Sequence, residues 1–194
     1  MTKKYILSIG LFLTSLGTYC QNVNELKVFA GTSKAFINRQ VPMFGEGSIQ
    51  TRNFVECGVI FYSQVLENTR VGLGFNYSNS LIDFNANPAN HTLTQYSQRF
   101  QLISVPVLLE YNFFNYLFLS GGPLVDFQLT ENNFSDQSGI GYLLELGGKY
   151  GTGNLSFSLF PNFKKHSAIP FIRPENSKHI LTELGVQFGV GYKF

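Results

Sequence analysis

The last segment of the chain alternates between apolar and polar or small residues without interruption. One parity is wholly apolar: Leu184, Val186, Phe188, Val190, Tyr192 and Phe194. The other parity is small or polar: Glu183, Gly185, Gln187, Gly189, Gly191 and Lys193. Because successive side chains of a β-strand point to opposite faces, this pattern predicts one long strand with a wholly apolar face.

The same alternation recurs in segments 71–78, 102–111 and 139–150. Across these strands the second face is rich in glycine and serine, with about one acid or lysine per strand. A soluble sandwich or lipocalin-like barrel, the alternative, would carry many Lys, Glu, Asp and Thr on its water-facing side. Large apolar groups opposite small polar ones favour a barrel with lipid outside and a tight polar interior.

Eight strands are predicted, at residues 26–36, 52–65, 70–81, 97–112, 116–129, 139–150, 154–163 and 179–194. Short connections at 67–69, 113–115 and 151–153 alternate with longer ones at 37–51, 82–96, 130–138 and 164–178. Short periplasmic turns and long extracellular loops are typical of outer-membrane barrels. The predicted fold class is therefore all-β, an eight-stranded antiparallel up-and-down transmembrane β-barrel with both termini in the periplasm.

Residues 1–20 have the features of a secretory signal peptide. Lys3 and Lys4 precede an apolar run from residue 5 to residue 16, and Thr18 and Cys20 occupy the −3 and −1 positions of a cleavage site. The run is shorter than the roughly 20 residues that a membrane-spanning helix needs. Lipidation of Cys20 is the alternative, and Tyr19 before it disfavours that outcome. We therefore expect a signal peptide at 1–20 and an outer-membrane β-barrel domain at 21–194, in a Gram-negative cell envelope.

Composition narrows the function further. Without residues 1–20, twelve basic and twelve acidic residues remain, a formal net charge of zero that argues against a nucleic-acid partner. Cys57 is then the sole cysteine, so an intrachain disulfide cannot form. Charged residues are 13%, about half the usual share, yet the mean hydropathy is only +0.03. The three histidines have no metal-ligand spacing and no glycine-rich phosphate loop occurs, so we expect no metal and no cofactor.

Three segments resemble the PorT-like outer-membrane β-barrel family. Residues 102–111, LISVPVLLEY, are similar to the family's "IPLLLKY" strand; Gly121-Gly122-Pro123 is similar to its "aGP" step; and residues 189–194 are similar to its closing strand. The similarity spans most of the mature chain. The seventh predicted strand departs from the family pattern at Pro161 and Asn162. The resemblance implies the fold and the outer membrane, and it leaves open the secretion role of the family's namesake.

The aromatic carboxyl terminus is a candidate assembly signal. Apolar residues occupy every second position before it, and the predicted signal consists of Phe188, Val190, Tyr192 and Phe194. The outer-membrane assembly machinery would read it by pairing with an exposed strand edge. The alternative is that any lipid-facing final strand would alternate in this way.

The strand positions predicted to face the barrel interior carry eight charged residues: Lys27, Glu56, Glu110, Asp126, Glu145, Lys149, Glu183 and Lys193. The interior of an eight-stranded barrel is just wide enough for side chains, so we expect these charges to pair in a salt-bridged plug. A proton or ion path is the alternative. Strand direction places Glu56, Asp126 and Glu183 toward the outer side. It places Lys27, Lys149 and Lys193 toward the periplasm.

A group in the last predicted loop, His166, Ser167, Glu175 and His179, has the residue types of a Ser-His-acid hydrolase. Lipid A deacylases are eight-stranded barrels with such groups, but their His-x-Ser pattern is absent. His166 and Ser167 are adjacent and would point apart on an extended strand. We therefore expect polar loop residues here.

The predicted protein is an integral outer-membrane barrel without catalysis. Its loops would serve a structural or adhesion role, in contact with outer-membrane lipid. A component of an envelope or secretion machine of the PorT type, with an envelope protein as partner, is the first alternative. A lipid A-modifying hydrolase is the second.

Overall fold

The computed structural model describes residues 23–39, 48–86, 94–114, 116–130, 136–172 and 179–194, and this part of the chain consists of strands and their connections. Among these residues, no helix is long and apolar enough to cross a membrane. The strands are β1 (Asn24–Arg39), β2 (Ser48–Thr51), β3 (Phe54–Leu66), β4 (Thr69–Ala86), β5 (Thr94–Phe113), β6 (Leu117–Gln128), β7 (Gly139–Thr152), β8 (Leu155–Pro170) and β9 (His179–Lys193). The predicted signal peptide lies outside the described residues.

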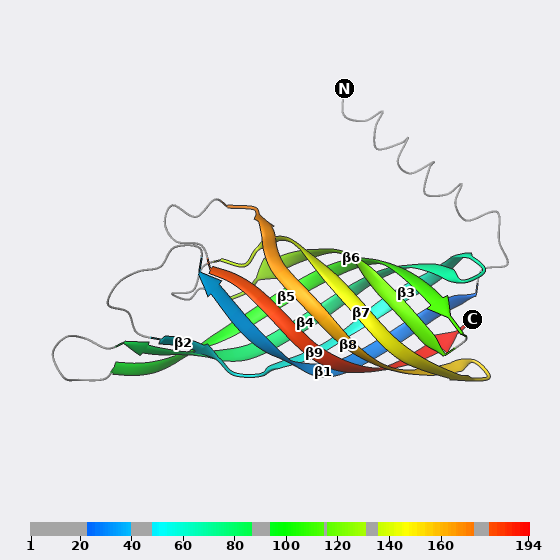
Figure 1. Ribbon diagram of the computed structural model, residues 1–194, viewed down its shortest axis with the longest axis horizontal. Helices are drawn as coiled ribbons and strands as arrows, with labels where there is room; N and C mark the ends of the chain where they lie inside the picture. Colours follow the sequence, from blue (N-terminus) through cyan, green and yellow to red (C-terminus); the bar gives the residue numbers. More distant parts are fainter. Residues whose placement is uncertain (1–22, 40–47, 87–93, 115, 131–135, 173–178) are drawn as a thin grey trace, which may run out of the picture.

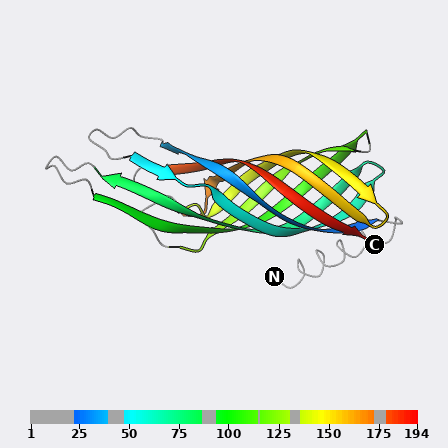
Figure 2. The same ribbon diagram turned by 90° about the horizontal axis from the view of Figure 1, so that it is seen from below.

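The strands form one closed antiparallel ring in the order β4-β3-β1-β9-β8-β7-β6-β5, and the β4–β5 pairing completes it (Figures 1 and 2). β2 and β3 share one position in the ring, because β2 pairs with residues 82–85 of β4 and β3 pairs with residues 69–79. The ring therefore has eight positions, and the predicted eight-stranded antiparallel barrel is confirmed.

One end of the barrel carries the three short turns, and we call it the turn end. β3 and β4 are separated by two residues, as are β7 and β8. The chain ends meet here too, since Asn24 and Phe194 are joined by backbone hydrogen bonds. Gly153 has a φ of 57°, which glycine adopts freely, whereas Phe114 has a φ of 55° that is uncommon for a residue with a side chain. The opposite end, with the four longer connections, is the loop end.

Several strands extend further toward the loop end than the sequence indicates. β1 reaches Arg39, β4 reaches Ala86, β5 starts at Thr94, and β8 reaches Pro170, so parts of the expected loops 37–51, 82–96 and 164–178 are strand. The expectation was wrong there because apolar alternation ends where lipid contact ends. Ladder hydrogen bonds continue beyond that point without needing an apolar face.

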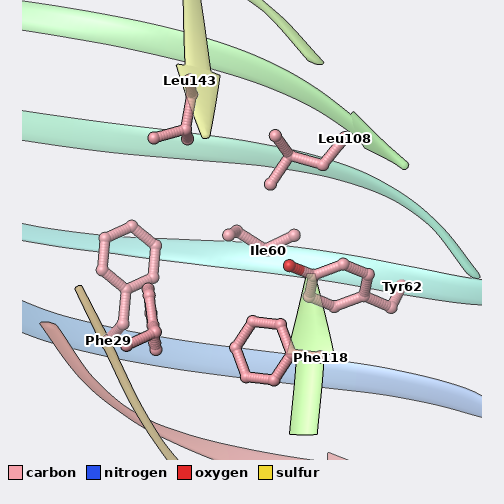
Figure 3. Packing of buried hydrophobic residues seen from close by; sticks show 7 residues of the cluster. Phe29, Ile60, Tyr62, Leu108, Phe118 and Leu143 are labelled. Atoms are coloured by element: carbon pink, nitrogen blue, oxygen red, sulfur yellow. The ribbon is translucent and has the colours of Figure 1, made fainter. Parts of the chain in front are cut away.

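The outer wall is apolar, and the interior consists of four stacked layers. The inward residues of β1 pass through them in order: Glu25 and Lys27, then Phe29, then Ser33, then Ala35. The second is the middle apolar layer, which comprises Phe29, Ile60, Tyr62, Leu108, Phe118, Leu143 and Phe160 (Figure 3). The fourth is the loop-end apolar layer, which comprises Ala35, Phe54, Ile82, Phe100, Leu102 and Leu181. Gly147 makes room for the middle layer, because a Cβ there would collide with Phe118 and Phe160.

Candidate functional site

The first charged layer, the turn-end ion cluster, comprises Glu25, Lys27, Arg70, Glu110 and Lys149. The Arg70 guanidinium bridges Glu25, at 2.5 Å, and Glu110. Lys149 and the Ser156 hydroxyl each donate to Glu25 at 2.7 Å. Glu25 and Glu110 are fully buried, so these charge-assisted bonds replace the water that each carboxylate loses.

Lys27 lies in an aromatic cage at the boundary with the middle apolar layer. Its Nζ is 4.7 Å, 4.9 Å and 5.3 Å from the ring centroids of Tyr62, Phe118 and Phe160. It makes no hydrogen bond with any residue that the structure describes, and Glu110 Oε2 is 3.8 Å away. The ring faces therefore provide much of the attraction that holds this buried ammonium group.

The second charged layer, the loop-end ion cluster, comprises Glu56, Asp126, Lys164, His166 and Glu183. Lys164 contacts Glu56 and lies 3.8 Å from Glu183. His166 lies between two carboxylates, with Nδ1 2.9 Å from Asp126 and Nε2 3.2 Å from Glu183.

Uncharged side chains complete this cluster. Gln187 donates to Glu56 at 2.8 Å. Ser33 donates to Glu183 at 2.8 Å, and Ser104 donates to Asp126 at 2.6 Å. Each buried carboxylate thus accepts at least one bond from a neutral donor as well as facing a cation, which reduces the cost of its burial.

The structure corrects the expected placement of His166 and Ser167 in a loop. Both lie in β8 and both are fully buried, so they do not point apart. The cause is a bulge: Ile140 pairs with Ile169 and Tyr142 with Lys165, so three β8 residues oppose Gly141 alone. Ser167 adopts a φ of 45° within this bulge. A Cβ on Gly141 would collide with the Lys165 carbonyl oxygen, so the bulge requires glycine there.

The hydrolase grouping is not assembled among the described residues. Both ring nitrogens of His166 face carboxylates, which is the geometry of an ion pair rather than of a base beside a nucleophile. His179 begins β9, and Glu175 lies outside the described residues. No group of three His, Cys, Asp or Glu in the described part of the chain is arranged to hold a metal ion.

The predicted interior charges are divided between the two clusters. Lys27, Glu110 and Lys149 lie at the turn end, and Glu56, Asp126 and Glu183 lie toward the loop end. Glu145 is buried between them, beside Ser120 on β6, without an ion pair among the described residues. Lys193 is half-buried at the turn-end rim near Gly151 and likewise joins no ion pair in the described part.

Four buried members of the clusters were not predicted: Glu25, Arg70, Lys164 and His166. The alternation of the strands could have identified the first two as inward-facing. Glu25 lies two residues before Lys27 on the same face, and Arg70 lies on the same face as Gly72 and Gly74. Lys164 shares the parity of Ser156 and Ser158, but the charged run from 164 to 166 is typical of a loop. Only strand pairing places it inside.

The residues of the predicted assembly signal line the outer wall at the turn end. Phe188, Val190, Tyr192 and Phe194 are all exposed, and the Tyr192 and Phe194 rings stack at 6.4 Å. Phe194 also lies 6.4 Å from the Phe61 ring. The recognition of this stripe by an assembly machine stays a prediction.

A closed ring with an apolar outer wall and a packed, ion-paired interior defines a small transmembrane β-barrel. The chain belongs to the family described as "Outer membrane protein beta-barrel domain", whose model matches residues 24–194. The predicted outer-membrane location is thereby confirmed. No curated protein matches the sequence.

Solved structures share this fold at low sequence identity. Neisserial surface protein A is 15% identical, with 88% of this chain and 97% of that chain covered and a TM-score of 0.53. OprG from Pseudomonas aeruginosa is 16% identical, with 89% and 95% covered and a TM-score of 0.53. AlkL, solved in DMPC bilayers, is 12% identical, with 91% and 93% covered and a TM-score of 0.54. The shared feature at these identities is the fold.

Proposed function

We propose that the protein is a non-catalytic outer-membrane anchor that presents its loop end to a partner outside the cell. The observation that carries this proposal is the contrast between a filled interior and a projecting loop end. Two ion clusters and two apolar layers fill the barrel, so transport through it is disfavoured. Contact with a partner is then left to the surfaces at the two ends.

The projecting part is a three-stranded sheet made of β2 and the loop-end halves of β4 and β5. β4 has 18 residues and β5 has 20, whereas a membrane-spanning strand needs roughly 9–11. These strands reach well beyond the others at one end of the barrel (Figures 1 and 2). Asp83 of β4 stabilises this sheet, because its carboxylate accepts hydrogen bonds from Arg52 at 2.8 Å and from Ser97 at 2.5 Å.

The test is affinity purification from native outer membranes after mild cross-linking. One variant replaces residues 87–93, between β4 and β5, with a Gly-Ser linker. The matched control replaces the turn Gly153–Asn154 at the opposite end with another two-residue turn. We expect a stoichiometric partner that the control retains and the loop variant loses. Recovery of no partner with the wild type, or retention by the loop variant, would contradict the proposal.

Membership of a PorT-type envelope machine is the second candidate. It is favoured by the resemblance of residues 102–111, 121–123 and 189–194, which lie in β5, β6 and β9. A machine component on the periplasmic side would contact the turn end. In the same purification, a partner lost on replacing Gly153–Asn154 and kept by the loop variant would support this candidate.

A further inference from the structure

Two lysines lie on the outer wall, diagonally across β9. Strand pairing puts Lys34 of β1 beside Leu184, whose other neighbour is Phe163 of β8. In the next row toward the loop end, Phe36 lies beside Thr182, whose other neighbour is Lys165. β1, β9 and β8 run side by side in Figure 1. Lys34 and Lys165 therefore flank Thr182 and Leu184 on the membrane-facing side.

The ammonium groups of both lysines lie near aromatic rings. Lys34 Nζ lies 5.9 Å from the Phe36 ring, and Lys165 Nζ lies 6.0 Å from the Tyr142 ring. In the described part of the chain, no carboxylate forms an ion pair with either. The surrounding wall is apolar, with Phe36 and Leu184 exposed. A lysine at such a place extends its ammonium group to the headgroup layer rather than leaving it in hydrocarbon.

The positions of Lys34 and Lys165 along the barrel axis agree with a place at the headgroup layer. Lys34 comes ten residues after Asn24, and Lys165 comes ten residues after Leu155, each counted from the turn end of its strand. A rise of about 3.4 Å per residue and a strand tilt of about 40° put both roughly 25 Å from the turn end. That is about the height of the apolar band of an outer-membrane barrel. Both lysines thus lie at the outer boundary of the hydrocarbon layer.

A groove adjoins Lys34 on the side toward the membrane centre, and Lys165 lies beyond its lining residues. It has a volume of about 400 Å³, and Thr32, Lys34, Pro161, Leu184 and Val186 are among its lining residues. The row Thr32–Val186–Pro161 forms its floor, because these side chains are smaller than Phe188 and Leu159 in a neighbouring row.

Polar Asn53 and Asn162 also line the groove, but the row that forms its floor offers a ligand no free hydrogen-bond donor among the described residues. The Thr32 hydroxyl is already bonded to the Phe54 carbonyl at 2.9 Å, and Pro161 has no N–H. Since the strands are tilted, a groove across them descends obliquely into the bilayer. The floor of the groove, with Val186 and Pro161, therefore suits a hydrocarbon chain.

We propose that this surface binds a phosphate-bearing lipid of the outer leaflet, of the lipid A class. The Lys34 and Lys165 ammonium groups hold the phosphate, with the Thr182 hydroxyl between them as a further donor. An acyl chain of the same lipid occupies the groove over Val186. Two cations without an acid select an anionic headgroup over a zwitterionic one, which carries its own positive charge.

The test measures lipid A binding by native mass spectrometry on the full barrel in neutral detergent micelles. The two probes are bisphosphorylated lipid A and the same lipid A with both phosphates removed. Lys34→Gln and Lys165→Gln should each weaken binding of the phosphorylated probe roughly fivefold, and the pair roughly 25-fold. Neither substitution should change binding of the dephosphorylated probe. The pair Lys34→Arg and Lys165→Arg should retain the wild-type affinity.

Arg99→Gln is the matched control, because Arg99 is also an exposed outward cation but lies on β5, four ring positions from β9. It should leave the affinity unchanged, and heat-modifiable gel migration shows that each variant is folded. Equal wild-type affinity for the two probes would overturn the proposal. So would an unchanged affinity in the double glutamine variant, or an equal loss in Arg99→Gln, which would indicate general attraction without a site.

Discussion

Asn24 and Phe194 exchange a reciprocal pair of backbone hydrogen bonds that joins the two ends of the barrel domain. The Asn24 N–H donates to the Phe194 carbonyl at 3.1 Å, and the Phe194 N–H donates to the Asn24 carbonyl at 2.9 Å. The Phe194 side chain, in contrast, is 63% exposed on the outer wall. The backbone of Phe194 thus helps to close the barrel, while its phenyl group remains accessible.

This division allows the assembly signal to be tested without disturbing closure. Phe194→Ala keeps both backbone bonds and removes a partly exposed ring, so burial alone predicts a loss of no more than about 2 kcal/mol. If the ring is recognised during assembly, outer-membrane levels should fall sharply and processed chains should accumulate in the periplasm. Cell fractionation measures this, with Val190→Ala as the burial control. Equal outer-membrane yields of the two variants would contradict a recognition role.

Phe188→Arg should destabilise the barrel by roughly 2–4 kcal/mol, because Phe188 faces the lipid and an arginine there must leave water. Phe188→Leu, which keeps an apolar side chain, should cost less than about 1.5 kcal/mol. Urea unfolding from lipid vesicles measures both. A similar loss for the two variants would mean that residue 188 does not contact hydrocarbon.

Lys164→Met should cost about 3–5 kcal/mol, because it leaves the buried Glu56 without its cation and removes a nearby cation from Glu183. Adding Glu56→Gln should recover part of the loss, since one uncompensated carboxylate is then neutral. Unfolding of the two single variants and the double variant gives the coupling energy. Strict additivity would show that the two groups do not interact in the folded barrel.

Gly141→Ala should be destabilising by about 1–3 kcal/mol, because its Cβ would overlap the Lys165 carbonyl oxygen within the β8 bulge. Gly148→Ala is the matched control on the same strand, because the nearest atom to a new Cβ there is the Tyr116 backbone carbonyl oxygen, at 3.9 Å. Its effect on unfolding in vesicles should be small. The opposite ranking would mean that the bulge is absent.

The filled interior predicts that the reconstituted barrel does not form a steady open channel in planar bilayers. The Lys27 cage and the ion clusters span the interior, and eight strands leave no continuous aqueous lumen. A porin of known conductance provides the positive control. Reproducible large unitary currents from the purified protein would contradict a packed interior.

The sequence by itself determined which face of each strand is apolar, the number of strands in the barrel and the outer-membrane location. Alternation such as Leu184 to Phe194 is a local property, because a strand with lipid on one side needs an apolar residue at every second position. The same parity placed Glu56 and Glu183 inside. It could not say which charges meet, since it identifies a face of a strand and not its neighbour's register.

Only the tertiary structure decided the pairings and the site on the outer wall. His166 meets Asp126 across forty residues of sequence, and it does so because a bulge opposite Gly141 turns it inward. Lys34 and Lys165 are brought to either side of β9 by ring closure, which follows from the register of three strands together. Register depends on hydrogen bonds between distant segments, so a pattern within any one segment carries no record of it.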